Sequence, residues 1–318
     1  MDVSVIIVNY HCAQMTIDCI RSVFEKTQTA SFEVIVVDNA SGDGSAELLR
    51  QTFGNLIQVV ESEENLGFGK ANNLGARHAS GEYLFLLNPD TILLSDAIGI
   101  LRDYLRQHPQ TGVAGGNLYA PDMTPAPSYC LAFDDLHHER RNAGWAHLIG
   151  SKVRTKLGIR GKMKEFNFSN RGKQVAYIFG ADMMLPKCLF DEVGGFDPAF
   201  FMYAEEQELT WRITQRGYRV MSVPQAQIIH LEGATTSETH AFSERQFRMR
   251  MNGTLTYYQK RFGDAGAAEF FRLRTRRYDR LMKIARVQGK LTEDFIPAIQ
   301  NRYLKEEYNL LYNKSEKP

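Results

Sequence analysis

Four short stretches of the chain carry polar side chains in patterns that can do chemistry. Two of them place acidic or amide groups directly after an apolar run: Val34–Asp38 continues into Asn39, and Leu84–Leu87 continues into Asn88-Pro-Asp90. The other two are Gly194-Gly-Phe-Asp-Pro198 and Ala204-Glu-Glu-Gln-Glu-Leu209. Together they predict a nucleotide and a divalent cation held at the edge of a parallel sheet, with a base nearby.

Asp38 ends the second apolar run and precedes a turn that is rich in glycine and short polar residues. A carboxylate at a strand end can accept a hydrogen bond from a pyrimidine base or from a ribose hydroxyl, so Asp38 and Asn39 are candidate nucleotide-binding residues. The alternative is that Asp38 only caps the following helix.

Asp90, Asn88 and His230 are the candidate metal ligands. Mg²⁺ and Mn²⁺ take one or two oxygen ligands from protein and leave other positions to phosphate and water. His230 follows the apolar run at residues 226–229, and a neutral imidazole there can bind the cation. The alternatives are an ordinary type I turn at Asn88-Pro-Asp90 and a plain strand-end histidine.

A glycine-rich segment at residues 65–75 lacks the lysine and hydroxyl spacing of a P-loop. Its glycines predict a helix that starts close to the sheet with its amides toward the nucleotide. Asn65, Lys70 and Asn73 in this segment are therefore also candidate nucleotide-binding residues.

Leu209 and Ile213 are four residues apart and should bury one face of a helix whose first turn holds three glutamates. The helix dipole favours negative charge there, so acids that merely stabilise the helix are one interpretation. Glu206 lies about 100° around the helix from Glu205, so the two cannot do one job together.

The elements that must position these residues follow from hydrophobic periodicity. Residues 3–8, 33–38, 57–60 and 83–87 are short apolar runs, largely β-branched, separated by stretches with helical spacing. This alternation predicts an α/β fold with a mostly parallel, doubly wound sheet. The predicted domains are residues 1–238, with a basic, irregular excursion at about 119–173, and a helical region at 239–318.

Composition indicates an ordinary globular protein of 318 residues, 43% hydrophobic, with net charge +1. Four cysteines without metal-ligand spacing suggest a reducing, cytoplasmic setting, and no apolar run is long enough for a membrane span.

Residues 137–173 carry ten Lys/Arg against two Glu, and residues 240–290 carry thirteen Lys/Arg against four acids. These regions are either solvated helix faces or surfaces for phosphate, at a lipid-linked diphosphate or the inner membrane face. No nucleic-acid partner is expected, because neither region follows a known binding motif.

Taken in order, the stretches resemble the inverting glycosyltransferases of family 2, which have the GT-A fold and use nucleotide sugars. The resemblance covers roughly residues 3–237, and Asn-Pro-Asp in place of Asp-x-Asp is similar to the rhamnosyltransferases of bacterial surface polysaccharide synthesis. It implies that Asp38 holds the base or ribose, and that Asp90, with Asn88 and His230, holds Mg²⁺ or Mn²⁺ and the diphosphate. Asp182, Glu205 and Trp211 would lie near the donor sugar or the acceptor.

The same resemblance implies that Glu206 is the base of a single displacement with inversion. The family commonly has an aspartate where this chain has Glu206, and misplacement of a reacting group by about 1 Å can cost on the order of 100-fold in rate. The implied partners are a nucleotide-sugar donor, dTDP-rhamnose by subgroup, and a saccharide or lipid-linked saccharide acceptor.

Two other functions fit parts of the sequence. A nucleotidyltransferase would need a basic, glycine-rich phosphate loop after the first strand, where this chain has Asn9-Tyr10-His11-Cys12. A non-catalytic module that binds nucleotide sugars is made plausible by the altered acidic motif.

Overall fold

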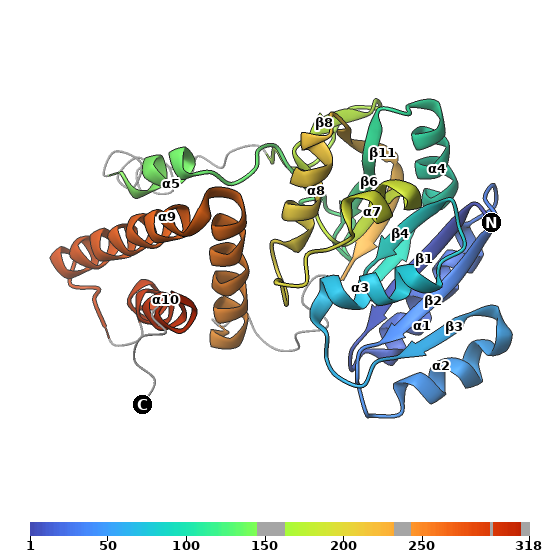
Figure 1. Ribbon diagram of the computed structural model, residues 1–318, viewed down its shortest axis with the longest axis horizontal. Helices are drawn as coiled ribbons and strands as arrows, with labels where there is room; N and C mark the ends of the chain where they lie inside the picture. Colours follow the sequence, from blue (N-terminus) through green and yellow to red (C-terminus); the bar gives the residue numbers. More distant parts are fainter. Residues whose placement is uncertain (145–162, 232–242, 293–294, 313–318) are drawn as a thin grey trace. The chain divides into compact units, whose positions relative to one another are not determined.

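The structure is a computed structural model that describes residues 1–144, 163–231, 243–292 and 295–312 (Figure 1). The chain divides into two compact units. The first contains Met1–Phe133, Met163–Phe201 and Glu205–Glu238, and the second contains Asp134–Lys162, Met202–Ala204 and Thr239–Pro318. The division predicted from the sequence places all residues before 239 in one domain. Sequence pattern does not show the long-range contacts that group residues 134–144 and 202–204 with the C-terminal helices.

The N-terminal half of the first unit confirms the predicted parallel strands. These strands run in the order β3-β2-β1-β4, and every neighbouring pair is parallel. Their bounds are β1 (Val3–Asn9), β2 (Phe32–Asp38), β3 (Gln58–Glu61) and β4 (Tyr83–Leu87). Asn9 and Asp38 are paired in register at the carboxyl ends of β1 and β2, so both side chains reach the same edge of the sheet.

The other half of the sheet is mixed, which the periodicity did not predict. Strand β10 lies antiparallel between β4 and β6, whereas β11 is parallel to β6 and antiparallel to β5 and β8. The bounds are β5 (Thr91–Leu93), β6 (Thr111–Tyr119), β8 (Lys173–Val175), β10 (Asp182–Pro186) and β11 (Arg219–His230). A small second sheet pairs β7 (Tyr129–Cys130) with β9 (Tyr177–Ile178).

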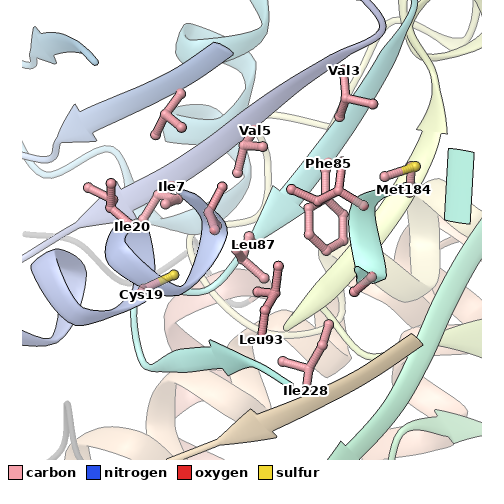
Figure 2. Packing of buried hydrophobic residues seen from close by; sticks show 14 of the residues in the cluster. Val3, Val5, Ile7, Cys19, Ile20, Phe85, Leu87, Leu93, Met184 and Ile228 are labelled. Carbon is pink, nitrogen blue, oxygen red and sulfur yellow. The ribbon is translucent and has the colours of Figure 1, made fainter. Parts of the chain in front are cut away.

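Alternate strand residues face two separate apolar cores. On one face Val5, Ile7 and Phe85 pack with Cys19 and Ile20 from α1, as Figure 2 shows. The helices on this face are α1 (Ala13–Lys26), α2 (Ser45–Phe53) and α4 (Ala97–Gln107). A short 3₁₀ turn, η1 (Gly54–Leu56), follows α2.

The opposite face buries Ile6, Leu84 and Leu86 beneath the other helices of this unit. These are α3 (Gly67–His78), α7 (Lys187–Val193) and α8 (Glu205–Gln215). Gly75 lets α3 lie close to the sheet, because a Cβ there would be 2.6 Å from a methyl carbon of Ile6. Helices on both faces of the sheet confirm the doubly wound arrangement.

The second unit is helical in the part that the structure describes. It contains α5 (Leu136–Ala143), α9 (Glu244–Val287) and α10 (Ile296–Tyr312). The Tyr258 hydroxyl donates to the Asp135 carbonyl at 3.2 Å, which ties α9 to the start of α5. Helix α9 bends at Gly263, whose φ of 69° and ψ of −177° are not helical (Figure 1).

None of the helices in the described ranges is both long and apolar enough to cross a membrane. The four cysteines are free thiols, as their spacing predicted.

Candidate active site

Asp38 lies at the centre of a buried polar network at the ends of β1 and β2. Its Oδ1 accepts from Asn9 Nδ2 at 2.7 Å and from the Ser41 hydroxyl at 2.6 Å, while Oδ2 accepts from the Ser41 amide at 3.2 Å. Only 4% of the Asp38 surface is exposed. A carboxylate offers about four acceptor positions, so Oδ2 retains capacity for a further donor such as a base N–H or a ribose hydroxyl.

Asn39 and Asn65 shape the turn that leads into α3. Asn39 donates to Asn65 Oδ1 at 3.1 Å and accepts from the Leu66 amide at 2.8 Å, and Asn65 Oδ1 also accepts from the Gly67 amide at 2.9 Å. These amide groups therefore fix the backbone at the start of α3. Direct contact of Asn39 and Asn65 with a nucleotide stays a prediction.

Asn73 fastens α3 to the Gly194-Gly-Phe-Asp-Pro198 stretch. Its amide donates to the Phe196 carbonyl at 2.8 Å and accepts from the Phe196 amide at 2.9 Å, so both ends of the side chain are used on backbone. Lys70, three residues earlier on α3, is half-buried and has no ion pair among the described residues. Of these two predicted nucleotide ligands, Lys70 keeps its charge available for phosphate.

The three predicted metal ligands lie together. Asp90 Oδ1 is 3.3 Å from His230 Nε2, and the Asn88 amide nitrogen is 3.5 Å from the same Nε2. The pairing of β5 with β11 explains this geometry, because His230 stands opposite Thr91, the neighbour of Asp90. Asp90 is only 5% exposed and its backbone carbonyl accepts from the Leu231 amide at 2.8 Å, so its position is well fixed.

This side-chain set fits a divalent cation that is shared with a ligand. A carboxylate oxygen of Asp90 and the side-chain amide of Asn88 both approach the imidazole nitrogen of His230, and among the described residues no group of three or more His, Cys, Asp or Glu forms a closed metal site. A hard cation with few protein ligands fills the rest of its coordination shell with phosphate oxygens and water. The donor set therefore suits Mg²⁺ or Mn²⁺ bound together with a diphosphate.

Asp182 lies next to this cluster but is fully buried. One carboxylate oxygen accepts from the Gly116 amide, and the other has no hydrogen-bond partner in the described structure. Burial raises the pKa of Asp182 to about 7, while the Gly116 hydrogen bond and the charge of His230 act in the opposite direction. Because 0% of its surface is exposed, contact between Asp182 and an acceptor stays a prediction.

The first two residues of α8 have different surroundings. Glu205 is 3% exposed, and burial, reinforced by the charge of Glu206, raises its pKa well above the usual value. Glu206 is half-buried, and a Cβ placed on Gly180 would be 4.0 Å from Glu206 Cβ. Glu205 therefore favours its neutral form, which leaves Glu206 as the more accessible carboxylate for proton transfer.

The third glutamate of the cluster is structural. Glu208 makes two hydrogen bonds of 2.7 Å to Arg212, whose guanidinium also donates to the carbonyls of Val193 at 2.6 Å and Gly195 at 2.8 Å. Trp211 is half-buried on the same helix. It lies about 140° around the axis from Glu206, so α8 does not present the two side chains on one face. A sugar contact by Trp211 stays a prediction.

Shared neighbours link the predicted nucleotide and metal sites with the glutamates at the start of α8. The charges of Asp90 and Asp38 both raise the pKa of the Cys12 thiol, after the larger effect of burial, so both carboxylates lie near Cys12. The backbone N–H of Asn88 donates to the Ala181 carbonyl at 2.9 Å, and a Cβ on Gly180 would be 4.0 Å from Glu206 Cβ. The Gly180–Ala181 segment thus lies next to both the predicted metal site and the predicted base.

The backbone immediately before α8 is unusual. Tyr203 and Ala204 have φ values of 71° and 70°, and both are non-glycine residues in the left-handed region. Each such residue costs roughly 1–2 kcal/mol and persists only where its surroundings impose it. Strain of this kind commonly occurs where a functional side chain must be presented.

Asn9 and Ser41, which hold the Asp38 carboxylate, were not predicted as site residues. Asn9 carried the same signal as Asp38, a polar residue that ends an apolar strand, but it was used only to exclude a phosphate loop. Ser41 carried no separate signal, because serine is common in any turn.

Comparison with known proteins agrees with this geometry. The family model described as Glycosyl transferase family 2 matches residues 4–183, more than half of the chain. An N-acetylglucosaminyl-diphospho-decaprenol L-rhamnosyltransferase from Mycobacterium tuberculosis is 24% identical over 219 residues, which are 65% of this chain and 69% of that protein.

Solved structures share the fold. A mannosyltransferase from Pyrobaculum calidifontis, in complex with GDP-Man and Mn²⁺, has a TM-score of 0.59 at 17% identity, covering 98% of this chain and 87% of the other. GalNAc-T7 with UDP, GalNAc and Mn²⁺ has a TM-score of 0.60 at 16% identity, covering 100% of this chain and 58% of the other. Both are glycosyltransferases, and the likeness supports the predicted GT-A fold.

Proposed function

The chain belongs to glycosyl transferase family 2, and we propose that this glycosyltransferase is an inverting enzyme with Glu206 as its general base. The observation that carries the proposal is the position of the Gly180–Ala181 segment. Ala181 is hydrogen-bonded to Asn88 of the predicted metal site, and Gly180 adjoins Glu206. A sugar carbon beside this segment would have a leaving diphosphate on one side and an incoming hydroxyl group on the other.

In this proposal, the donor nucleotide binds at the carboxyl ends of β1 and β2. Asp38 accepts a hydrogen bond from the base or ribose, while Asn9 and Ser41 keep its carboxylate in place. Lys70 and the amides at the start of α3 face the phosphates. Asn39, Asn65 and Asn73 act by fixing the backbone around α3.

Asp90, His230 and Asn88 would hold a divalent cation, Mg²⁺ or Mn²⁺, at the diphosphate. When bound, such a cation stabilises the negative charge that develops on the departing nucleoside diphosphate. Both fold neighbours were solved with Mn²⁺ and a nucleotide or nucleotide sugar, which supports a divalent cation here.

The chemical step is a single displacement at the anomeric carbon. Glu206 takes the proton of the acceptor hydroxyl onto a carboxylate oxygen as that hydroxyl oxygen bonds to the carbon. The bond between the carbon and the diphosphate oxygen breaks, and its electron pair leaves with the diphosphate. Attack from the side opposite the leaving group inverts the configuration. Glu205, held neutral by burial, does not compete for the proton.

The donor and acceptor are proposed from the relative. The M. tuberculosis protein is named as an L-rhamnosyltransferase that acts on an N-acetylglucosaminyl-diphospho-decaprenol. We therefore propose dTDP-rhamnose as donor and a lipid-linked saccharide as acceptor, in bacterial surface polysaccharide synthesis. A lipid-linked acceptor requires the enzyme to work at the inner face of the cell membrane.

The C-terminal part of α9 offers a surface for that membrane. Four exposed cations occur at spacings of four, seven and three residues, which places them on one face of the helix. They are Arg272, Arg276, Lys283 and Arg286. Each cation close to an anionic leaflet adds roughly 1 kcal/mol of binding free energy.

Release of nucleoside diphosphate tests the enzymatic proposal. The purified protein is incubated with dTDP-rhamnose, UDP-sugars and GDP-sugars in Mn²⁺, Mg²⁺ or EDTA, with a lipid-linked N-acetylglucosamine acceptor. We expect diphosphate release and acceptor glycosylation from dTDP-rhamnose only when a divalent cation is present. Transfer with retained configuration, or turnover that is unchanged in EDTA, would contradict the mechanism.

Vesicle sedimentation tests the membrane surface. We expect the protein to bind vesicles of phosphatidylcholine with phosphatidylglycerol at low salt, and not vesicles of phosphatidylcholine alone. Replacing the four α9 cations with glutamine should abolish binding. A matched control removes four exposed cations from the first unit and should retain binding. These control residues are Arg21, Arg50, Arg77 and Arg216. Equal binding of the two variants would rule out the α9 surface.

A further inference from the structure

The strand pair β1 and β2 has a buried polar contact at each end. At the amino end the Ser4 hydroxyl donates to Glu33 Oε1 at 2.6 Å, and at the carboxyl end Asn9 Nδ2 donates to Asp38 Oδ1 at 2.7 Å. Both contacts join residues that are paired in the same parallel register. Only the second contact lies at the edge where the nucleotide is proposed to bind, so the first serves as a reference for a purely structural cross-strand contact.

The Asn9 side chain is held at both of its polar atoms. Nδ2 donates to Asp38 and also to the Ser41 hydroxyl at 3.2 Å, while Oδ1 accepts from the Thr16 hydroxyl at 2.8 Å. The side-chain amide of asparagine has a donor end and an acceptor end, so a donor placed at Oδ1 turns Nδ2 toward Asp38. The Thr16 hydroxyl therefore determines which end of the amide Asp38 meets.

Thr16 lies in the first turn of α1, where its hydroxyl has one short contact. The hydroxyl oxygen is 2.8 Å from Asn9 Oδ1, compared with 3.2 Å from the Cys12 carbonyl and 3.7 Å from the Cys12 sulfur. A hydroxyl group has a single proton to donate, and Asn9 Oδ1 is the nearest acceptor. The Cys12 thiol also lies 3.5 Å from Asn9 Oδ1, but a thiol is a weak donor. Thr16 is therefore the main donor to the Asn9 amide.

Burial separates the residues that orient from the residue that can bind. Thr16 and Asn9 are both 0% exposed, whereas Asp38 is 4% exposed. Two donors, Asn9 Nδ2 and the Ser41 hydroxyl, meet at Asp38 Oδ1, while Oδ2 accepts only from the Ser41 amide at 3.2 Å. Oδ2 is thus the oxygen with more capacity for a donor from a ligand.

We propose that Thr16 is a positioning residue for donor binding that acts through Asn9 on Asp38. By holding the Asn9 amide in one orientation, Thr16 keeps Asp38 Oδ1 occupied and leaves Oδ2 to accept from an N–H or O–H group of the nucleoside. The inference rests on the proposed function, in which Asp38 contacts the base or ribose. Because this role concerns the nucleoside and not the reacting carbon, its loss should weaken donor binding and leave the chemical step nearly unchanged.

The decisive variant is Thr16→Val, which keeps the branched shape of the side chain and removes the hydroxyl. Asn9 Oδ1 then lacks its main donor, and the amide can rotate. The probe is dTDP, UDP or GDP, whichever the wild type binds most tightly by calorimetry. We expect its dissociation constant and the KM of the matching nucleotide sugar to rise roughly three- to tenfold, equivalent to one ordinary hydrogen bond. We expect kcat to stay within about twofold, and Thr16→Ser to restore wild-type values.

The matched control is Ser4→Ala at the other end of the same strand pair. It removes a buried hydroxyl that donates to Glu33 and accepts from the Gly81 amide at 2.8 Å. Ser4 lies about 16 Å along the strand from Asn9, so nucleotide binding should not respond although the melting temperature falls. An equal loss of nucleotide affinity in Ser4→Ala and Thr16→Val would overturn the proposal, because general weakening of β1 would then explain the effect.

A double-mutant cycle separates action through Asn9 from other effects of Thr16. Asn9→Ala removes the amide and should weaken nucleotide binding at least as much as Thr16→Val does. In the Asn9→Ala background, Thr16→Val should cause no further loss, because no amide is left to orient. Additive losses in the double variant would show that Thr16 acts by another route and would overturn the proposal.

Exchange of the Asn9 side-chain amide protons provides a readout that does not depend on catalysis. We expect these protons, followed by NMR, to exchange at least roughly tenfold faster in Thr16→Val than in the wild type. Thr16→Ala takes the place of Thr16→Val if the latter does not fold, since the smaller side chain adds no crowding. Equal exchange in the variant and the wild type would overturn the orienting role.

Asp38→Ala distinguishes failure of this inference from failure of the proposed function. It should raise the dissociation constant of the nucleotide roughly 10- to 100-fold, the range for a hydrogen bond to a charged group. Unchanged affinity in Asp38→Ala would show that Asp38 does not bind the nucleotide, and the proposed function and this inference would fail together. Weakened binding in Asp38→Ala with wild-type binding in Thr16→Val would leave the proposed function intact and overturn the role of Thr16.

Discussion

The two units treat buried carboxylates differently. In the helical unit, buried acids are paired with arginine: Glu139 with Arg274 at 2.6 Å, and Glu307 with Arg248 at 2.9 Å. In the sheet unit, Asp182 and Glu205 are buried with one oxygen each that lacks a hydrogen-bond partner among the described residues, and burial raises both pKa values. A buried acid paired with arginine is neutralised in place, whereas a buried acid with a raised pKa is a candidate for handling charge or protons.

Helix α8 contains both cases within one turn. Glu208 is neutralised by Arg212, which also binds the carbonyls of Val193 and Gly195, whereas Glu205 is buried with an oxygen that has no hydrogen-bond partner among the described residues. Helix α8 thus holds a paired acid and an unpaired buried acid only three residues apart. The four predictions below test this separation.

Removing the proton acceptor should have the largest effect. Glu206→Gln keeps the shape of the side chain but cannot take the acceptor proton, so transfer should fall roughly 10²–10⁴-fold, the usual contribution of a general base. Binding of nucleoside diphosphate, measured by calorimetry, should be nearly unchanged. Glu208→Gln is the contrasting variant. It should lower the stability of the protein, because Arg212 loses its charged partner, and it should lower turnover much less than Glu206→Gln does. Unchanged turnover in Glu206→Gln would exclude Glu206 as the base.

Breaking a paired acid in the helical unit should affect stability instead of chemistry. Glu139→Leu leaves the buried Arg274 charge uncompensated and should lower the free energy of unfolding by about 3–5 kcal/mol. Replacing both residues, as Glu139→Leu with Arg274→Met, should restore most of that loss. Urea denaturation followed by circular dichroism measures both. If the double variant were as unstable as the single one, the pair would do more than neutralise charge.

Weakening the metal site should change donor affinity only in the presence of cation. Asp90→Asn retains the size of the side chain but removes its charge, and we expect the donor dissociation constant in Mn²⁺ to rise about 10- to 100-fold. In EDTA the wild type and the variant should bind the donor equally. Asp191→Asn, which removes an exposed acid on α7, is the control and should show no difference. Equal donor affinity of Asp90→Asn and wild type in Mn²⁺ would contradict the assignment.

Neutralising the buried Glu205 should give the smallest effect, a gain of stability. Because the folded-state pKa of Glu205 is raised, the native protein keeps a proton that the unfolded chain releases above about pH 4.5. Stability must therefore decrease as pH rises from that value toward the raised pKa. Glu205→Gln should match the wild-type melting temperature at pH 4 and exceed it by a few degrees at pH 8. A melting temperature lower than wild type at pH 8 would show that the Glu205 charge is compensated.

The sequence predicted the parts of the fold that depend on local pattern. Apolar, β-branched runs located β1, β2, β3 and β4, and polar residues at their carboxyl ends, such as Asp38, marked the binding edge. It did not predict that β10 enters the sheet antiparallel between β4 and β6, because strand order depends on long-range pairing. The grouping of Met202–Ala204 with α9 was hidden for the same reason, since it depends on a glycine fifty residues away.

The sequence predicted which residues of the candidate site group together, but not the hydrogen bonds that they make. The order of the motifs predicted that Asp90, Asn88 and His230 lie together, and in the structure Asp90 and the Asn88 side chain are 3.3 Å and 3.5 Å from His230 Nε2. The sequence could not show that the amides of Asn39 and Asn73 are used on backbone, because a polar side chain in a motif looks the same whether it faces a ligand or the chain. Burial, which distinguishes Glu205 from Glu206, likewise depends on packing.

The bend in α9 at Gly263 divides one long helix into two pieces. The piece before the bend contains Arg250 and Gly253, and the piece after it carries the exposed cations from Arg272 to Arg286. Since the left-handed glycine interrupts the regular helix, a substitution in the later piece need not twist the earlier one. Replacing the exposed cations from Arg272 to Arg286 should therefore change the proposed membrane surface without twisting the part of α9 that precedes the bend.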